Sequence, residues 1–449
     1  MARFGFIRLT VILYVVLILL SVSVMAEADM VEMSSTLNPV GSGARATGMG
    51  GAFISVADDA TAASWNPAGL IHLERPEISV VGSFFSRQQQ YRSDVQPEVD
   101  SKKNSMDTLG LNYASAAYPF VLFKHNMIFS VNYQRLYEMD KKVNVNYTKV
   151  RDNNGGTLNN SIRFDQKGYL YALSPAYAIQ IIPQLYLGAT VNFWGNYAGN
   201  NGWKSTQVSG STGKITVGEK LHDWVSNSTE TMKISFKGTN ANLGFLWNVS
   251  EKVTIGGVYK TPFNAKLHRD ETFRSTEGFT DIAPPSESSS SASEDFTMKM
   301  PASYGLGISY RFSDKLMTAL DVYRTGWSRF VLVDSNGNSK NPLDGTPISE
   351  GRLKDTTQVR LGTEYLIIKD NYVIPLRAGI FYDPEPAKES LDDFYGFSLG
   401  TGYSNKKFSF DVSYQFRFGR SVTGDVPFIA GTSSDINQHA VLASIIFYF

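Results

Sequence analysis

The sequence predicts a transmembrane β-barrel, and three observations lead to this fold class. Segments in which apolar and polar residues alternate recur through most of the chain, as expected of strands with two different faces. Short and long connections join these segments in turn, as in barrels that cross a membrane. The chain also ends on such a segment, whose last residue is the aromatic Phe449. A water-soluble β-sandwich shares the alternation but does not explain the two classes of connection.

The clearest strand places six large apolar residues on one face, from Phe408 to Phe418, and polar residues such as Asp411 and Arg417 on the other. An apolar face of this size needs lipid or a second protein layer. We expect fourteen antiparallel strands, an even number that puts both ends of the sheet on the short-turn side. They lie near residues 76–92, 107–122, 127–149, 160–182, 184–198, 229–249, 252–267, 295–312, 315–334, 355–369, 371–382, 391–404, 406–420 and 436–449.

Residues 1–26 have the three parts of a secretory signal peptide. Arg3 and Arg8 supply the positive start, residues 9–20 form the apolar stretch, and Ala26 is a small residue at the cleavage point. A transmembrane anchor is the alternative, but the apolar run is shorter than the roughly 20 residues that a spanning helix needs. No later segment is apolar enough either, so a membrane protein made from the rest must cross as a β-barrel.

Composition excludes several function classes. The chain has no cysteine, so disulfides, thiolate chemistry and cysteine-ligated zinc are unavailable. The 42 basic and 42 acidic residues balance, which argues against binding of nucleic acid. The histidines are dispersed, with no metal-type pair and no nucleophile-elbow serine, so we expect neither an enzyme nor a metal or cofactor site. They are His72, His125, His222, His268 and His439.

Three long connections, at residues 198–229, 267–295 and 335–354, are polar and rich in Ser, Asn, Gly and Thr. Apolar residues interrupt the first two, and two interpretations stay open: a landing site for a hydrophobic ligand, or residues that pack the loops together. The serine-rich residues 286–293 are expected to form a mobile external loop. The candidates for the landing site are Trp203, Leu221, Trp224, Phe273 and Phe279.

The segment Asn38–Leu70, rich in Gly and Ala, lies between the signal peptide and the first strand. A compact, bend-prone segment ahead of a barrel is most simply a plug in its lumen, and we divide the chain into a hatch at residues 27–74 and a barrel at residues 75–449. Residues 41–46 fit the spacing of the dinucleotide fingerprint but lack its preceding strand. Asp58 and Asp59 are either a cation-ligand pair or residues that cap a helix start and a turn.

Together these motifs resemble the outer-membrane FadL/TodX (OmpP1) family, which takes up long-chain fatty acids and other hydrophobic compounds. The plug is similar to the family pattern at Asp58-Asp59-Ala60 and Asn66-Pro67-Ala68. A second match runs from Tyr323 to Phe330 (YRTGWSRF), after a strand that begins at Met300-Pro301. A third is Arg377–Ile380 followed by Asp383-Pro384. The resemblance covers essentially the whole mature chain.

The resemblance implies a fourteen-stranded barrel in the bacterial outer membrane, a hatch that gates the lumen, and a hydrophobic site between two outer loops. It also implies a lateral exit at a kinked third strand. Small, flexible residues help this kink in the family, whereas residues 128–138 here contain no Gly or Pro, so we expect a gap of different shape or none. The candidates are Asp58, Asp59, Asn66, Pro67 and Ala68 for the gate, and Phe129, Asn132 and Tyr133 for the exit strand.

We therefore expect passive uptake of a hydrophobic small molecule by a monomer surrounded by outer-membrane lipid. One alternative is a related plugged barrel that serves as a binding platform in protein secretion, and another is an open diffusion porin. The residue that would pair with a ligand carboxylate is not assigned, and the loop candidates are Lys204, Lys214, Arg269 and Arg274.

Overall fold

The computed structural model describes residues 41–93, 103–150, 156–423 and 432–449. The predicted signal peptide, residues 1–26, and the start of the predicted hatch, residues 27–40, lie outside the described residues. Most of the described chain is in antiparallel strands, and its helices are short. None of these helices is long and apolar enough to cross a membrane.

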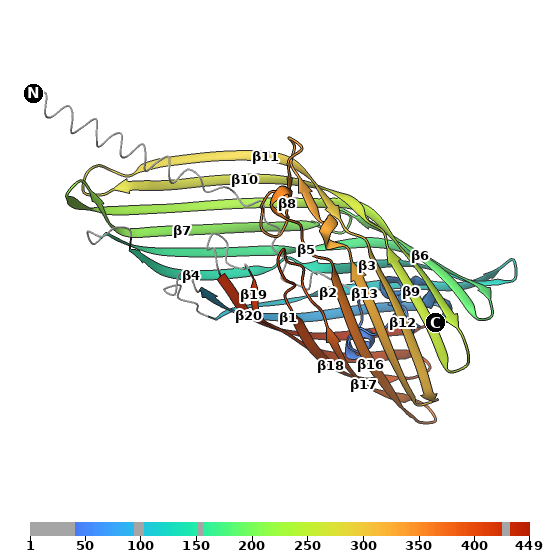
Figure 1. Cartoon of the computed structure of the whole chain (residues 1–449). Coiled ribbons are helices and arrows are strands. Elements are labelled where there is room, and N and C mark those ends of the chain that lie inside the picture. Colours follow the sequence, from blue (N-terminus) through green and yellow to red (C-terminus); the bar gives the residue numbers. More distant parts are fainter. Residues whose placement is uncertain (1–40, 94–102, 151–155, 424–431) are drawn as a thin grey trace, which may run out of the picture.

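The strands form one closed barrel (Figure 1). Successive wall strands pair antiparallel, and β1 (Glu77–Ser93) pairs with both β2 (Asn104–Leu122) and β20 (Thr432–Tyr448), which closes the ring. In the described chain the wall has fourteen strands, because five of them are each divided in two by a short irregular stretch and β15 (Ser339–Lys340) belongs to a loop. The predicted strand number and antiparallel arrangement are confirmed.

The remaining strands follow in chain order. They are β3 (His125–Glu138), β4 (Lys141–Val150), β5 (Thr157–Ile182), β6 (Leu185–Trp194), β7 (Gly202–Val217), β8 (Lys220–Asn248), β9 (Val253–Lys260), β10 (Phe263–Phe279), β11 (Ser286–Met300), β12 (Ser303–Ser313), β13 (Leu316–Thr325), β14 (Val331–Val333), β16 (Thr356–Ile368), β17 (Val373–Tyr382), β18 (Phe394–Ser404) and β19 (Phe408–Thr423).

The sequence explains several of the breaks and turns. Pro262 lies between β9 and β10, and Pro301 lies between β11 and β12. Proline has no N–H to give to a strand ladder, so it interrupts the wall at both places. In the β2–β3 hairpin, Phe123 and Lys124 have φ angles of 51° and 64°. Two successive positive φ angles are those of the type I′ turn, whose twist matches that of the strands.

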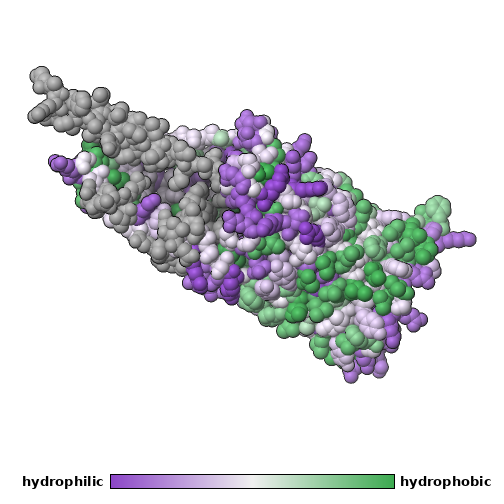
Figure 2. All heavy atoms as spheres, in the orientation of Figure 1, coloured by the Kyte–Doolittle hydropathy of each residue, from purple (hydrophilic) through white to green (hydrophobic). Residues whose placement is uncertain are grey.

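The outer face of the barrel is apolar toward the end with the short turns (Figure 2). On β12 the outward residues are exposed, and Gly305, Gly307 and Ser309 between them are buried on the inner face. On β19, Phe410 likewise lies outside and Asp411 inside. The alternation predicted from the sequence is therefore confirmed. The exposed residues of β12 are Tyr304, Leu306, Ile308, Tyr310 and Phe312.

Three short helices occupy the lumen: α2 (Ala44–Gly48), α3 (Ala62–Trp65) and η1 (Pro67–His72). Hydrogen bonds join this segment to inner-wall residues far away in sequence. The Ala44 N–H donates to the hydroxyl of Ser444 at 2.8 Å, and the hydroxyl of Thr190 donates to the Ala63 carbonyl at 2.9 Å. Residues 41–73 thus lie inside the barrel, in the position expected of a plug.

Six strands, β4, β5, β7, β8, β10 and β11, continue past the others and form an extension on one side of the barrel, away from the C-terminus (Figure 1). β7 and β8 pair continuously from Gly202↔Ser235 to Val217↔Lys220. The prediction of long loops at residues 198–229 and 267–295 is therefore wrong, because both regions are mostly hairpins. Ser, Thr and Gly occupy both faces of these strands, so no apolar stripe marks them in the sequence.

The serine-rich residues 286–293 are also not a loop. They lie in β11, where Ser288 pairs with Ser275 and Ser291 with Thr272 of β10. The third long connection, residues 335–354, keeps its loop character. Its regular elements are β15 and η3 (Ile348–Glu350), and η2 (Trp327–Arg329) lies just before it.

Candidate ligand pathway

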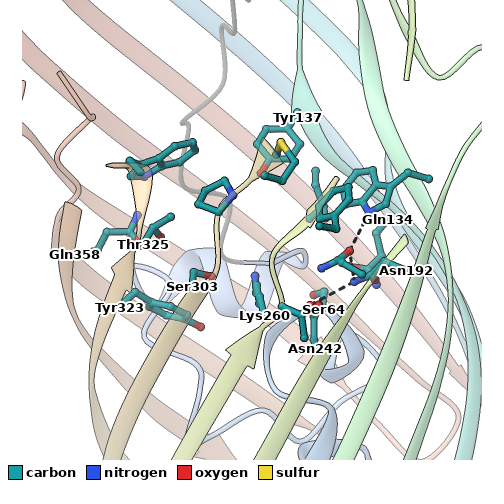
Figure 3. A pocket seen from close by; sticks show the side chains of 18 residues that line it. Ser64, Gln134, Tyr137, Asn192, Asn242, Lys260, Ser303, Tyr323, Thr325 and Gln358 are labelled. Atoms are coloured by element: carbon teal, nitrogen blue, oxygen red, sulfur yellow. Dashed lines mark hydrogen bonds between the residues drawn. The ribbon is translucent and has the colours of Figure 1, made fainter. Parts of the chain in front are cut away.

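A cavity lies between the inner wall and the hatch, with an empty volume of about 700 Å³ that includes its open side. Aromatic side chains line one part of it, and polar side chains line the part that meets hatch residue Ser64. In Figure 3, Lys260 lies between Ser303 and Ser64, and Tyr137 lies on the opposite side. A lining that mixes aromatic side chains with a few polar groups is typical of small-molecule sites.

The polar part of the cavity contains groups that hydrogen bonds within the protein do not satisfy. The amide of Gln134 and the hydroxyl of Tyr323 have no partner among the described residues, although both side chains are almost fully buried. The nearby amides of Asn192 and Asn242 are paired with each other at 3.3 Å. Because a buried polar group without a partner is costly, Gln134 and Tyr323 are suited to bind a polar group of a ligand.

The aromatic part of the cavity belongs to a larger buried cluster, the aromatic cluster. Its rings come from six wall strands and from the segment after β13, and the indole of Trp194 stacks on Phe263 at a centroid distance of 6.0 Å. The indole N–H of Trp194 donates to the side-chain oxygen of Asn240 at 2.9 Å, so its polar atom is satisfied. The aromatic residues of this cluster are Tyr137, Trp194, Trp203, Phe236, Phe263, Phe296, Trp327 and Phe330.

The structure distributes the five candidates for the landing site over several places. Trp203 belongs to the aromatic cluster. Trp224 and Phe279 meet edge to face at 4.9 Å in an outer cluster with Leu158 and Ile215, near the tip of the extension. Leu221 is exposed and Phe273 is half-buried. All five lie on strands rather than in loops.

The candidate gate residues make specific contacts within the hatch. Asp59 accepts from the N–H and the hydroxyl of Thr61 at 2.8 and 2.6 Å, which is the capping role considered from the sequence. Asp58 forms an ion pair with Arg45. The Asn66 side chain donates to the carbonyls of Ile54 and Phe245, both at 2.9 Å, and thereby joins the hatch to β8. Pro67 and Ala68 follow as the first residues of η1 and are buried.

Arg45 is the hatch residue that sequence reasoning missed. Its guanidinium forms two hydrogen bonds, each 3.0 Å, with the carboxylate of Glu364 on β16. Burial opposes the charge of Arg45, but Asp58, Glu364 and Asp59 outweigh it and hold the pKa of the guanidinium well above its usual value. Burial of Asp59 raises the pKa of its carboxyl, and Arg45 opposes this shift only in part. These charged contacts fix α2 to the wall.

Further buried charges on the wall complete this anchor. Arg377 donates to Glu364 and to Asp411, both at 2.5 Å, so a chain of alternating charges runs from the hatch to β19. Nearby, the two oxygens of Asp321 have different surroundings: one accepts from the N–H groups of Phe53 and Ile54, at 2.6 and 2.8 Å, and the other has no partner among the described residues. No sequence motif marks the contacts with the hatch, because Glu364 and Asp321 lie more than 200 positions from their hatch partners.

The wall has a seam between β2 and β3. Their ladder runs from Leu122↔His125 to Tyr113↔Gln134 and then stops, although β2 continues to pair with β1, and β3 with β5. Beyond that point side chains bridge the two strands: Asn112 donates to the Arg135 carbonyl at 3.2 Å. The ladder of β3 with β5 is irregular between Arg135 and Tyr137, as at a β-bulge, so β3 departs from regular geometry without Gly or Pro.

Arg135 lies at this seam. Its guanidinium pairs with Glu138 and lies 4.1 Å from the ring centroid of Tyr169. It also occupies the space next to Gly110 of β2, where a Cβ would come within 2.2 Å of the guanidinium. Among the candidates for the exit strand, Phe129 is exposed on the outer face, and Tyr133 stacks on Tyr171 at 5.1 Å. Asn132 is buried inside, where it donates to the Ser174 carbonyl.

The four basic residues considered as partners of a ligand carboxylate also lie in different places. Lys204, Lys214 and Arg274 are exposed residues of the extension, and Lys214 forms an ion pair with Asp223. Arg269 is buried, close to Glu271 and Glu294 and above the ring of Phe296. None of the four lines the cavity, where Lys260 is the basic residue.

Comparison with known proteins agrees with this architecture. A family described as "Outer membrane protein transport protein (OMPP1/FadL/TodX)" matches residues 17–435. The chain belongs to this family. The resemblance seen in the sequence is thereby confirmed, and the protein is a β-barrel of the bacterial outer membrane. In such barrels the short turns face the periplasm, so the extension of this OMPP1/FadL/TodX member faces outward.

Solved structures show the same fold at low sequence identity. A FadL homologue of Pseudomonas aeruginosa is 15% identical, with a TM-score of 0.59, over 93% of this chain and 99% of that one. The toluene transporter TodX of Pseudomonas putida is 14% identical, with a TM-score of 0.56, over 94% and 100% of the two chains. The CymD monoaromatic hydrocarbon channel is 17% identical, with a TM-score of 0.53, over 92% and 98%. No curated protein matches the chain in sequence.

Proposed function

We propose that this protein is a passive channel that takes up hydrophobic compounds across the outer membrane. The observation that carries the proposal is the aromatic cluster on the inner wall, which leads into a cavity bounded by the hatch. Each methylene transferred out of water contributes about 0.8 kcal/mol. A path of apolar surfaces therefore suits a hydrophobic ligand better than a water-filled pore does. The hatch closes that path to ions.

The polar part of the cavity favours an amphiphile over a pure hydrocarbon. A long-chain fatty acid would place its carboxylate near Lys260, Gln134 and Tyr323, with its chain among the aromatic rings. Hydrogen bonds between a carboxylate and a charged partner are stronger than neutral ones, so Lys260 would orient the ligand. The relatives of known structure include toluene and monoaromatic hydrocarbon channels, so a small aromatic hydrocarbon is the alternative ligand class.

The hatch would act as the gate of this channel, and the β2–β3 seam as its exit. The hatch contacts of Asp58, Asp59 and Asn66 would hold the gate closed, and small movements of Pro67 and Ala68 would open the cavity below. The ligand would leave sideways through the β2–β3 seam, where the backbone ladder is already interrupted. A lateral exit delivers the apolar chain to the bilayer without passing it through water.

Uptake assays with radiolabelled oleate and toluene test the proposal in cells that express the full chain. We expect the unmodified protein to take up oleate. The variant Lys260→Met should raise the half-saturating oleate concentration by roughly 10-fold or more, because a charge-assisted hydrogen bond contributes about 1.5–3 kcal/mol. Toluene uptake should stay unchanged. Lys252→Met, in an exposed turn at the periplasmic end, is the matched control.

Two outcomes would contradict the proposal. Equal effects of Lys260→Met on oleate and toluene would show that Lys260 does not recognise a headgroup. Absence of uptake for every hydrophobic compound, together with co-purification of a secreted protein, would favour the role in protein secretion instead.

A further inference from the structure

We propose that the outward face of the extension binds the phosphate groups of an outer-leaflet lipid, a role that is independent of ligand uptake. The site is a set of six exposed lysines, the lysine belt, on five neighbouring strands: β5, β7, β8, β10 and β11 (Figure 1). The lysine belt consists of Lys167, Lys204, Lys233, Lys237, Lys266 and Lys299.

The strand register brings these lysines together. Lys167 pairs with Lys204, and Lys204 pairs with Lys233, so three lysines lie side by side on three adjacent strands. Lys237 and Lys266 form a second direct pair. Residues paired across antiparallel strands have Cβ atoms roughly 4.5–5.5 Å apart. Neighbouring residues such as Trp203 and Phe236 are buried inside, which fixes the lysines on the outward face.

Three carboxylates lie on the same face as the belt, those of Asp165, Asp270 and Asp295. None of the six lysines forms an ion pair with another described residue. Asp270 is paired in register with Lys233, but its carboxylate accepts from the Ser293 hydroxyl at 3.0 Å and lies 3.4 Å from His268. Asp295 is held by the same imidazole at 2.8 Å. Like charges placed directly opposite each other destabilise a sheet, so an external anion would relieve this repulsion.

The belt begins where the apolar surface ends. Along the outward face of β5, residues change from the exposed Tyr177 near the periplasmic end to Tyr169 and then to Lys167, two positions further out. Along β8 they change from Trp247 and Leu243 to Lys237 and Lys233. Aromatic residues on the outer face mark the edge of the hydrocarbon region in such barrels. The lysines therefore lie at the level of the lipid headgroups.

The dimensions of the belt fit a headgroup that carries more than one phosphate. Its five strands span four inter-strand spacings of about 4.8 Å, or roughly 19 Å. Lysines spread over this distance can contact several phosphate groups at once, as basic surface clusters do when they bind anionic headgroups. A nucleic acid is a poorer match, because the adjoining surface is apolar and reaches into the membrane.

Binding of purified lipid tests this proposal with the full chain in detergent. Native mass spectrometry measures retention of bisphosphorylated lipid A and of the same lipid after removal of its phosphates. We expect the triple variant Lys167→Gln/Lys204→Gln/Lys233→Gln to bind the phosphorylated lipid on the order of a hundredfold more weakly, since each lysine near an anionic surface contributes roughly a factor of five. The dephosphorylated lipid should bind as weakly to the unmodified protein.

The matched control removes three lysines from the periplasmic end. Lys369→Gln/Lys406→Gln/Lys407→Gln makes the same change in net charge on exposed turns and should leave lipid binding within about twofold. The heat-dependent electrophoretic mobility of each variant shows whether the barrel is folded. Equal binding of both lipids, or equal binding by the triple variant and the unmodified protein, would overturn the proposal. So would complete displacement of the lipid by millimolar inorganic phosphate, which would identify a site for a free anion.

Discussion

Glycines of the inner wall determine how closely the hatch approaches the barrel. A Cβ at Gly379 of β17 would come within 2.2 Å of the Gly50 nitrogen, and a Cβ at Gly188 of β6 would come within 2.3 Å of the Ala68 nitrogen. Both obstacles are backbone atoms of the hatch, which cannot move aside as a flexible side chain would. The lumen therefore holds the hatch only because the facing wall residues lack side chains.

The variant Gly379→Ala tests this fit. We expect it to loosen the hatch, to lower the free energy of unfolding by about 1–3 kcal/mol, and to raise ion conductance in planar bilayers, because overpacking forces the backbone to shift. Gly82→Ala is the control, since a Cβ at Gly82 meets no atom within 4 Å. If both variants conduct alike, the close contact at Gly379 does not keep the lumen closed.

At individual residues, the sequence indicated capping as one of two roles for Asp59, but it did not indicate the ion pair between Asp58 and Arg45. Capping is local, with Asp59 and Thr61 only two positions apart. The ion pair of Arg45 with Glu364 joins residues 319 positions apart, so it depends on the closed barrel and not on local pattern. The same holds for Lys260, which enters the cavity only because β9 and the hatch meet there.

At the scale of elements, strands in contact with the membrane were predictable and strands outside it were not. β12 and β19 show an apolar stripe on the outer face because lipid meets one side and the lumen the other. β7 and β11, which belong to the extension, have no such stripe. Their sequences are rich in serine and threonine and therefore resemble those of loops. The seam could not be predicted either. The point at which the ladder between β2 and β3 ends depends on how the two strands pair, and neither sequence alone shows it.

The seam between β2 and β3 is tested by changing Arg135, whose side chain lies at this seam. Arg135→Ala removes the guanidinium that lies against Gly110 and Tyr169, so we expect uptake of the hydrophobic ligand to rise roughly fivefold, the factor that corresponds to a cation–π contact of about 1 kcal/mol. Initial uptake rates measure the effect. Arg324→Ala on β13 removes an exposed ion pair with Asp355 and serves as the control. A slower rate in Arg135→Ala would mean that Arg135 guides the ligand and does not close the seam.

At the scale of the whole molecule, the barrel wall is taller on one side (Figure 1). The extension has its own buried contacts in the outer cluster, apart from the aromatic cluster nearer the cavity. Two separate hydrophobic surfaces along one inner face suggest that a ligand is first captured far from the membrane and then passed inward. The residues predicted as a landing site contribute to both surfaces, with Trp203 in the inner one and Trp224 and Phe279 in the outer one.

Shortening the β10–β11 hairpin separates capture from transport. Thr272 and Ser291 are paired, so a two-residue Asn-Gly turn between them can replace residues 273–290. The barrel should still fold, because the aromatic cluster lies below the cut. We expect the half-saturating ligand concentration to rise roughly 10-fold with the maximal uptake rate unchanged, since loss of one buried phenyl contact costs about 1.5 kcal/mol or more. Phe273→Ala/Phe279→Ala in the intact hairpin distinguishes loss of the rings from loss of the strands. Unchanged uptake at every concentration would show that the outer cluster only packs the extension together.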